Sequence, residues 1–308
     1  MTTMDDKATT EIQPDLHERI KSIGVIGAGQ MGNGIAHVSA LTGYTVYLND
    51  LDEARFQSAI DVMRKNMTRQ VKRGGISEDD MNAALGRISF APDYGHFKDA
   101  DLIIEAATEN QDLKQKIFQG LRDHVKPSAI LASNTSSISI TWLGAQTEHP
   151  NQFIGIHFMN PVPVMQMIEL IRGIATDAQT FEITKQFAAS LGKTIAVAED
   201  FPGFIINRIF VPMLNEAVFT LHEGIGDVES IDKAMKLGLN HPMGPLELAD
   251  FIGLDTCLSV MHVLYDGFAD SKYRPCPLLI KYVEAGWLGR KTGRGFYDYR
   301  GGTPVPAR

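Results

Sequence analysis

Residues 23 to 32 carry the clearest structural signal in the sequence. They read Ile23-Gly24-Val25-Ile26-Gly27-Ala28-Gly29-Gln30-Met31-Gly32, a short apolar run followed at once by glycines at GxGxxG spacing. A segment of small residues compatible with a helix follows over 35–41, and a second β-rich run over 45–48 leads to Asn49 and Asp50. A GxGxxG triplet alone has low specificity, but the order strand, glycine turn, helix, strand and acid supplies the context that a dinucleotide site requires.

Each glycine and the acid have a physical role in such a site. Gly27 permits the tight turn, Gly29 a close approach of the backbone to a pyrophosphate, and Gly32 close packing of the helix on the strand. The helix N-terminus offers N–H groups to the phosphates. A carboxylate at Asp50 can accept hydrogen bonds from both ribose hydroxyls of NAD and would repel the 2′-phosphate of NADP. We therefore expect a Rossmann domain with NAD as cofactor, bound by Gly27, Gly29, Gln30, Met31, Gly32 and Asp50; a purely structural β–α turn is the alternative.

Length and composition set the broad class. The chain has 308 residues, 44% hydrophobic and 21% charged, which at about 150 residues per domain suggests two globular domains. A net charge of −8 argues against nucleic acid as a partner, since phosphate binding relies on Lys and Arg. The two cysteines, Cys257 and Cys276, are not at CxxC spacing, so we expect buried thiols and no metal site.

The N-terminus and the apolar runs bear on location. Residues 1–19 are rich in acids and lack the apolar core of a signal peptide, so we expect a flexible polar tail. No apolar run approaches the length of about 18 residues that a membrane span needs. We expect a cytoplasmic protein.

Two further apolar runs, 101–107 and 129–132, continue the strand pattern. Ligands of open α/β sheets lie beyond the carboxyl ends of the strands. The polar residues placed there are candidate contacts, although each could instead cap the helix that follows: Glu105, Lys114, Asn134 and Ser136.

A long helix is expected after residue 52, with an apolar stripe formed by Phe56, Ile60, Met63, Met67 and Val71. Its other side carries a dense basic run. Such a run is usually a solvated face, but it also suits a polyphosphate ligand. Its members are Arg64, Lys65, Arg69, Lys72 and Arg73.

His157 stands apart from the other histidines because it ends an apolar strand, residues 153–156. Glu169 lies inside the next apolar run, where a carboxylate is costly unless paired. If the two strands are neighbours, the carboxylate would fix the imidazole tautomer and raise its basicity, as a general base requires. The alternative is a neutral structural histidine and an unrelated edge-strand glutamate.

The segment 201–208 leads into a helix that is apolar almost all round through Leu221, a pattern typical of a buried helix. Asn207 lies near its start, where a buried amide needs partners and a ligand oxygen could be one.

Together these motifs resemble the L-3-hydroxyacyl-CoA dehydrogenases, and more closely the stand-alone 3-hydroxybutyryl-CoA dehydrogenases, over about residues 20 to 300. The motifs are GVIGAGQMGNGIA, EAATE, SNTSS, GIHFMNPVPVM, DFPGFIINR, HPMGPLELADFIGLD and KTGRGFYDY. The resemblance implies an α/β fold, a Rossmann-type doubly wound, mostly parallel sheet over 20–201, with an all-α substrate and dimerisation domain over 202–308. It also implies a homodimer.

The resemblance implies roles for individual residues. His157 would be the general base and Glu169 the carboxylate that orients it, while Ser136 and Asn207 would hydrogen-bond the reacting oxygen. Asn160 would shape the substrate site. Further NAD contacts would come from Glu109, Lys114 and Asn134, and coenzyme A contacts from Asn66 and Arg73, which both depart from the Ser and Lys of the mitochondrial members.

The implied reaction is the NAD-dependent reversible oxidation of (S)-3-hydroxyacyl-CoA to 3-ketoacyl-CoA, with short-chain 3-hydroxybutyryl-CoA as the default, in β-oxidation of fatty acids or butanoate metabolism. Two alternatives remain. A sugar-acid dehydrogenase resembling L-gulonate 3-dehydrogenase would share the His–Glu pair but bind no CoA, and the basic run argues against it. A nucleotide-binding protein without turnover is disfavoured because Ser136, His157, Glu169 and Asn207 are all present.

Overall fold

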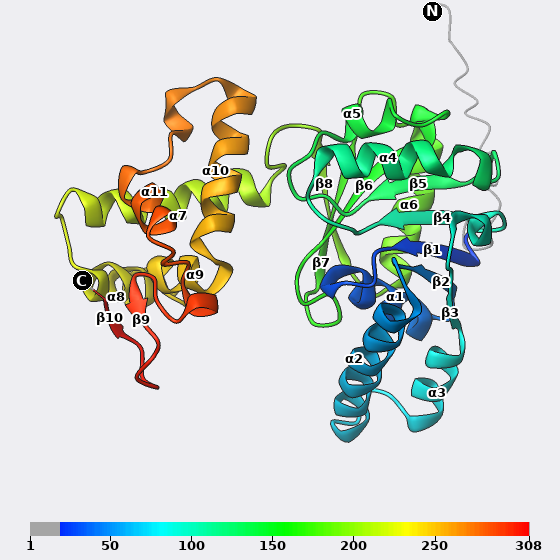
Figure 1. The fold of residues 1–308 in the computed structure, drawn as a ribbon, viewed down its shortest axis with the longest axis horizontal. Helices are drawn as coiled ribbons and strands as arrows, with labels where there is room; N and C mark the ends of the chain where they lie inside the picture. Colours follow the sequence, from blue (N-terminus) through cyan, green and yellow to red (C-terminus); the bar gives the residue numbers. More distant parts are fainter. Residues whose placement is uncertain (1–18, 308) are drawn as a thin grey trace, which may run out of the picture. The chain divides into compact units, whose positions relative to one another are not determined.

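The computed structural model describes residues 19–307 (Figure 1). Within these residues the chain divides into two compact units. The N-terminal unit comprises 19–135 and 140–197, and the C-terminal unit comprises Ser136–Ser139 together with the chain from Ala198 onward. The polar tail expected over 1–19 lies, apart from Arg19, outside the described residues.

The N-terminal unit is built on one eight-stranded sheet with the order β3-β2-β1-β4-β5-β6-β7-β8. The pairs from β3 to β6 are parallel, and β7 is antiparallel to β6. This confirms the Rossmann-type, mostly parallel sheet. The strands are β1 (Ser22–Ile26), β2 (Thr45–Asn49), β3 (Ile88–Phe90), β4 (Leu102–Glu105), β5 (Ile130–Ser133), β6 (Phe153–Phe158), β7 (Met167–Arg172) and β8 (Thr194–Glu199).

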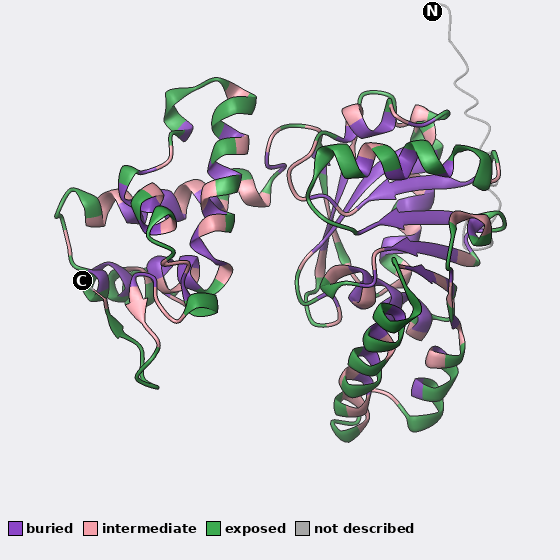
Figure 2. Ribbon diagram, viewed as in Figure 1, coloured by how far each residue is buried: buried purple, intermediate pink, exposed green. Residues whose placement is uncertain are grey.

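Helices connect and cover these strands: α1 (Gln30–Thr42), α2 (Glu53–Lys72), α3 (Glu78–Gly86), α4 (Gln111–Leu121), α5 (Ile140–Gly144) and α6 (Ala178–Ser190). Figure 2 shows the central strands buried along their length and the outer faces of α2 and α4 exposed. Since β2 and β4 flank β1 on opposite sides, the order of the strands reverses at β1, which is where open α/β sheets bind their ligands.

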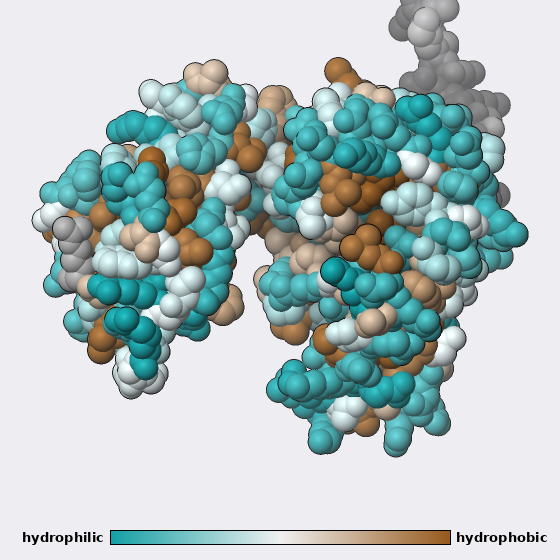
Figure 3. Space-filling view, viewed as in Figure 1, coloured by the Kyte–Doolittle hydropathy of each residue, from teal (hydrophilic) through white to brown (hydrophobic). Residues whose placement is uncertain are grey.

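α2 buries one face and exposes the other. Phe56, Met63 and Met67 of the predicted apolar stripe are buried, and Ile60 and Val71 pack partly buried against the same core. The basic run on the other side is exposed. Figure 3 shows that the surface over α2 and α3 is mostly hydrophilic.

The C-terminal unit is helical, with a small hairpin near the end of the chain. It contains α7 (Ile206–His222), α8 (Val228–Lys233), a π-helical turn (Ala234–Gly238), α9 (Pro245–Ile252), α10 (Leu254–Phe268), α11 (Pro277–Glu284), β9 (Tyr297–Asp298) and β10 (Val305–Pro306). Cys257 and Cys276 are buried and unbridged, and burial raises the pKa of the Cys257 thiol to about 12.

The expectation that α7 is buried all round is wrong. Val211, Leu214 and Val218 are buried in the helical core, but Ile209 is 67% exposed. A helix that is apolar on all sides is buried on all sides only if other elements pack around it. The sequence of the helix gives its composition but not the number of elements that contact it in one chain.

No single described helix is long and apolar enough to span a bilayer. The pair Pro245–Ile252 and Leu254–Phe268 passes such a test of length and composition together, but it is bent by 96°.

Candidate functional site

The glycine turn lies between β1 and α1 and has the geometry that phosphate binding requires. Gly27 has a φ of +100°, and a Cβ there would lie 2.7 Å from the Ala106 carbonyl oxygen. A Cβ on Gly32 would lie 1.7 Å from the Gly27 carbonyl oxygen, so α1 packs this closely only with glycine there. Gly29 faces open space and precedes the first turn of α1, where Gln30 and Met31 lie. The residues present therefore fit a dinucleotide.

A cavity of about 540 Å³ opens beside this turn; we call it cavity A. Its walls come from the carboxyl ends of β1, β2 and β4 and from α4. They include Gly27, Gly29, Asp50, Arg55, Asp93, Tyr94, Ala107, Leu113 and Ile117. Cavity A has the apolar walls and the fixed carboxylate that suit an adenosine group.

Asp50 is held firmly at the rim of cavity A. Its Oδ2 accepts a hydrogen bond from the Ala28 N–H and its Oδ1 one from the Leu51 N–H, both at 2.7 Å. Only 13% of the side chain is exposed. The carboxylate thus links the end of β2 to the glycine turn.

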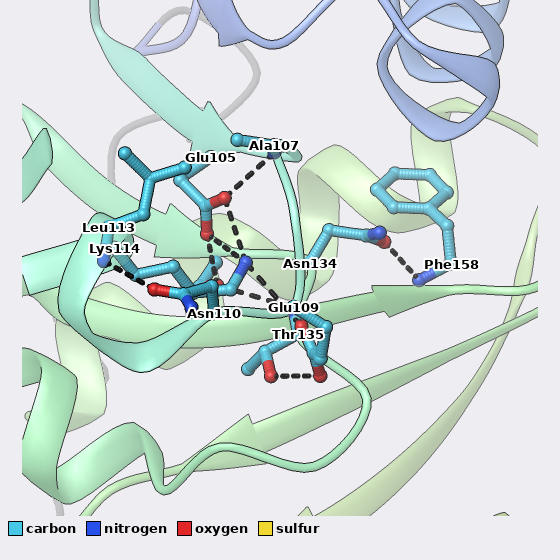
Figure 4. A network of polar contacts seen from close by, with 10 residues as sticks. Glu105, Ala107, Glu109, Asn110, Leu113, Lys114, Asn134, Thr135 and Phe158 are labelled. Carbon is cyan, nitrogen blue, oxygen red and sulfur yellow. Dashed lines mark hydrogen bonds and ion pairs between the residues drawn. The ribbon is translucent and has the colours of Figure 1, made fainter. Parts of the chain in front are cut away.

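A buried ion pair lies at the carboxyl end of β4 (Figure 4). The Lys114 Nζ donates to both oxygens of Glu105, at 2.7 and 2.6 Å, and the two side chains are 2% and 0% exposed. Glu105 also accepts from the Ala107 N–H and from the Ser133 hydroxyl. Lys114, which the resemblance assigned to NAD, is therefore held chiefly by Glu105.

Glu109 and Asn134 border this pair. The Lys114 Nζ lies 3.6 Å from Glu109 Oε2, and the Thr135 hydroxyl donates to Glu109 Oε1 at 2.6 Å. The Oδ1 of Asn134 accepts from the Phe158 N–H at 2.9 Å, which joins the ends of β5 and β6 (Figure 4). Asn134 lies at the carboxyl end of β5, where the sequence placed it, and Glu109, which the resemblance alone assigned, contacts the adjacent Thr135.

His157 and Glu169 are direct cross-strand partners on β6 and β7. The Nδ1 of His157 lies 2.7 Å from Glu169 Oε2. The imidazole is 11% exposed and the carboxylate is fully buried. The pairing that the sequence left open is thus present, because the hairpin aligns the two residues.

A second cavity, of about 490 Å³, shares Gly29 of the glycine turn with cavity A; we call it cavity B. Its walls come from the start of α1, from α2 and from the loop 160–163, and they include Asn66 and Asn160. Arg73, which follows the end of α2, is exposed and does not line cavity B.

Ser136 and Asn207 meet within the C-terminal unit. The Asn207 amide donates to the Ser136 carbonyl oxygen at 3.1 Å, and both residues are partly buried. The two residues assigned to the reacting oxygen therefore come from the Ser136–Ser139 segment and the start of α7.

Sequence reasoning missed two residues around the cavities. Arg55 lines both cavity A and cavity B. In the sequence it stands out only as a basic residue in the first turn of the helix that follows Asp50. The Lys193 Nζ donates to the carbonyl oxygens of Val162 and Met165, at 2.7 and 2.6 Å, and so anchors the loop that walls cavity B. No local pattern reveals that contact.

Comparisons with known proteins agree along nearly the whole chain. A family model described as 3-hydroxyacyl-CoA dehydrogenase, NAD binding domain, matches residues 22–201, and one described as 3-hydroxyacyl-CoA dehydrogenase, C-terminal domain, matches residues 203–299.

Among individual proteins, the chain is 63% identical over 289 residues to a 3-hydroxybutyryl-CoA dehydrogenase of Bradyrhizobium diazoefficiens, covering 94% of this chain and 99% of that protein. It is 50% identical over 280 residues to a probable 3-hydroxybutyryl-CoA dehydrogenase of Bacillus subtilis, covering 91% and 98%. The solved structure of (S)-3-hydroxybutyryl-CoA dehydrogenase PaaH1 from Ralstonia eutropha is similar with a TM-score of 0.90 and 49% identity, covering 91% and 99%.

Proposed function

Since this chain belongs to the 3-hydroxyacyl-CoA dehydrogenase family and is an NAD-dependent dehydrogenase, we propose that it interconverts (S)-3-hydroxyacyl-CoA and 3-ketoacyl-CoA, with 3-hydroxybutyryl-CoA as the short-chain substrate. The observation that carries the proposal is the buried His157–Glu169 contact at the carboxyl end of β6. The names of the relatives support the substrate class.

NAD, when bound, supplies the acceptor for the hydride that leaves the substrate. His157 takes the proton of the 3-hydroxyl group. An ionised carboxylate can only accept hydrogen bonds. The 2.7 Å contact between Glu169 Oε2 and His157 Nδ1 therefore favours the tautomer protonated on Nδ1, which leaves the lone pair on Nε2 as the proton acceptor. In the reverse direction the imidazolium returns that proton. General acid–base help of this kind contributes about 10² to 10⁴ in rate.

Ser136 and Asn207 hydrogen-bond the reacting oxygen in this proposal. Their contact through the Ser136 carbonyl gives the amide a fixed orientation. In the N-terminal unit, the fixed carboxylate of Asp50 serves the ribose, and Glu109, Lys114 and Asn134 line the edge of the sheet where the coenzyme is expected.

Coenzyme A has a terminal nucleotide rich in phosphates, and we place it on the α2 side of cavity B. Asn66 and Asn160 line the cavity. Arg69 donates to Asn66 at 3.4 Å, which joins the wall of the cavity to the basic run. The exposed bases Arg64, Lys65, Lys72 and Arg73 make no ion pair with the described residues within 4.0 Å, and their charges suit the phosphates.

We also propose that the protein is a homodimer in the cytoplasm. Large apolar side chains are exposed on the C-terminal unit, as Figure 3 shows in brown between hydrophilic ones. Burial of such side chains against a second subunit would remove apolar surface from water, which favours association. They include Ile209, Ile225, Leu237, Leu239 and Phe251.

The experiment follows nicotinamide absorbance with purified protein, acetoacetyl-CoA and NADH. Acetoacetate without CoA is the control for the thioester, and NADPH is the control for the coenzyme. Loss of NADH that requires the thioester supports the proposal. Activity on CoA-free hydroxy acids would favour a sugar-acid dehydrogenase, and NADH binding without turnover on any substrate would favour a binding protein.

A further inference from the structure

Arg55 lies in the wall that the two cavities share. Cavities A and B have Gly29, Asp50 and Arg55 in common. The one other charged residue in their described walls is Asp93, in cavity A. Within these walls, Arg55 is therefore the one cation that either cavity offers to a ligand.

The Arg55 side chain is only loosely held. Its Nη1 lies 3.7 Å from Asp50 Oδ1 and its Nε lies 3.7 Å from Asp52 Oδ2. Both distances exceed those of ordinary hydrogen bonds. The side chain is 60% exposed. The backbone, in contrast, is fixed, because the Arg55 N–H donates to Asp52 Oδ1 at 2.9 Å at the start of α2. The guanidinium can thus reorient toward a stronger anion while its Cα stays in place.

Asp50 carries the opposite charge to Arg55 and is rigidly held, because each of its carboxylate oxygens accepts a hydrogen bond from a backbone N–H. A ribose at this edge of cavity A would meet a fixed negative charge with a movable positive charge beside it. NADP differs from NAD by a phosphate on the ribose 2′-oxygen. A guanidinium binds phosphate through paired, charge-assisted hydrogen bonds.

We propose that Arg55 is a binding site for the 2′-phosphate of NADP(H), and that the Asp50 carboxylate beside it offsets most of this attraction by repelling the phosphate. Coenzyme preference in this chain then depends on one charge, and removal of that charge exposes a phosphate site without the addition of any base.

The test measures binding of NADPH and NADH by titration calorimetry, without acyl-CoA, so that its outcome is independent of the proposed substrate. In Asp50→Asn, the Asn oxygen can still accept from the Ala28 N–H, and we expect the Kd for NADPH to fall by about tenfold or more. In the double variant Asp50→Asn with Arg55→Met, that gain disappears. The pair 2′,5′-ADP and 5′-AMP repeats the comparison without the nicotinamide.

The matched control combines Asp50→Asn with Lys185→Met. Lys185 is a surface lysine that lines neither cavity, so this double variant has the same net charge as the other and should keep the gain in NADPH affinity. Equal NADPH affinities of Asp50→Asn and its Arg55→Met derivative would overturn the proposal, as would a loss of the gain with Lys185→Met.

Arg55→Met alone covers the case in which Asp50→Asn does not fold, since it leaves Asp50 intact. We expect it to weaken NADPH binding by several-fold and to change the Kd for NADH by less than about twofold. The same change for both coenzymes would contradict a role specific to the 2′-phosphate.

Discussion

At the scale of single residues, His157 is the first to test. Replacement by Gln keeps a side chain of similar size but removes the proton acceptor. We expect kcat to fall by about 10² to 10⁴, with the Kd for NADH unchanged, because His157 lines neither cavity A nor cavity B. Stopped-flow turnover and coenzyme titration measure the two quantities. Wild-type turnover in this variant would remove His157 from the mechanism.

Glu169 is tested by its isostere. Glu169→Gln can still hydrogen-bond His157 but lacks the negative charge that stabilises an imidazolium. We expect a lower kcat and a changed pH dependence of kcat/KM. A pH profile identical to that of the wild type would show that the carboxylate is only structural.

Sequence reasoning predicted the placement of residues whose contacts depend on their neighbours in the chain. Asp50 follows its strand directly, and His157 and Glu169 lie on consecutive strands, so a hairpin pairs them. Arg55 and Lys193 escaped notice because their contacts depend on how α2, β8 and the loop 160–166 meet. No local sequence pattern encodes how these segments pack against one another.

At the scale of elements, the Glu105–Lys114 pair ties β4 to α4, and Ser133 of β5 joins it. Glu105→Gln leaves the Lys114 charge buried without its main partner. We expect the free energy of unfolding to fall by about 3–5 kcal/mol, measured by denaturant unfolding. Glu109→Gln is the control, since Glu109 is 39% exposed and its loss should cost far less. Equal losses would contradict the assignment.

Lys193 fastens the hairpin loop between β6 and β7. Lys193→Met removes both hydrogen bonds to the carbonyls of Val162 and Met165. We expect exchange of the Val164 and Met165 amide hydrogens, which donate to Pro161, to quicken by about tenfold or more, because such charge-assisted bonds are worth about 1.5–3 kcal/mol. Lys185→Met should leave this exchange unaltered. Unchanged exchange in Lys193→Met would mean that the loop is held by its other contacts.

The elements themselves were mostly predictable, because each carries its own period or turn signal. The helix α7 was predicted as well, but the burial expected from its apolar residues on all sides was wrong, since the structure leaves Ile209 exposed. The number of packing partners around a helix is a property of the assembled chain.

At the scale of the whole molecule, one buried group in each unit contributes to the pH dependence of stability, and the two contributions have opposite signs. Burial lowers the pKa of His37 in α1 to about 4, whereas an unfolded histidine titrates near 6.5. The unfolded chain therefore takes up this proton first as the pH falls. The contribution of His37 to the stability of the N-terminal unit is full above about pH 6.5 and is lost towards pH 4, by roughly 3 kcal/mol.

Asp250, in α9 of the C-terminal unit, has the opposite sign. Burial raises its pKa to about 6 from 3.8, so its contribution is full below pH 3.8 and is lost as the pH rises through 6, again by roughly 3 kcal/mol. We expect calorimetric scans at pH 7 and at pH 4.5 to contain both contributions, which single variants can separate. Because acid removes the His37 contribution and restores the Asp250 contribution, His37→Leu should make the protein lose less stability between pH 7 and pH 4.5, and Asp250→Asn should make it lose more. A change of the same sign in the pH dependence of stability for both variants would contradict this account.

The β6–β7 hairpin holds the His157–Glu169 contact in its strands and a wall of cavity B in its loop, so each can change in evolution without the other. The register of the ladder sets the contact between His157 and Glu169, while the loop beyond its end forms one wall of cavity B. Insertions or substitutions in that loop can therefore alter which ligands a descendant accepts while the paired side chains stay in register. A lineage built on this hairpin can diversify its substrates without rebuilding its proton transfer.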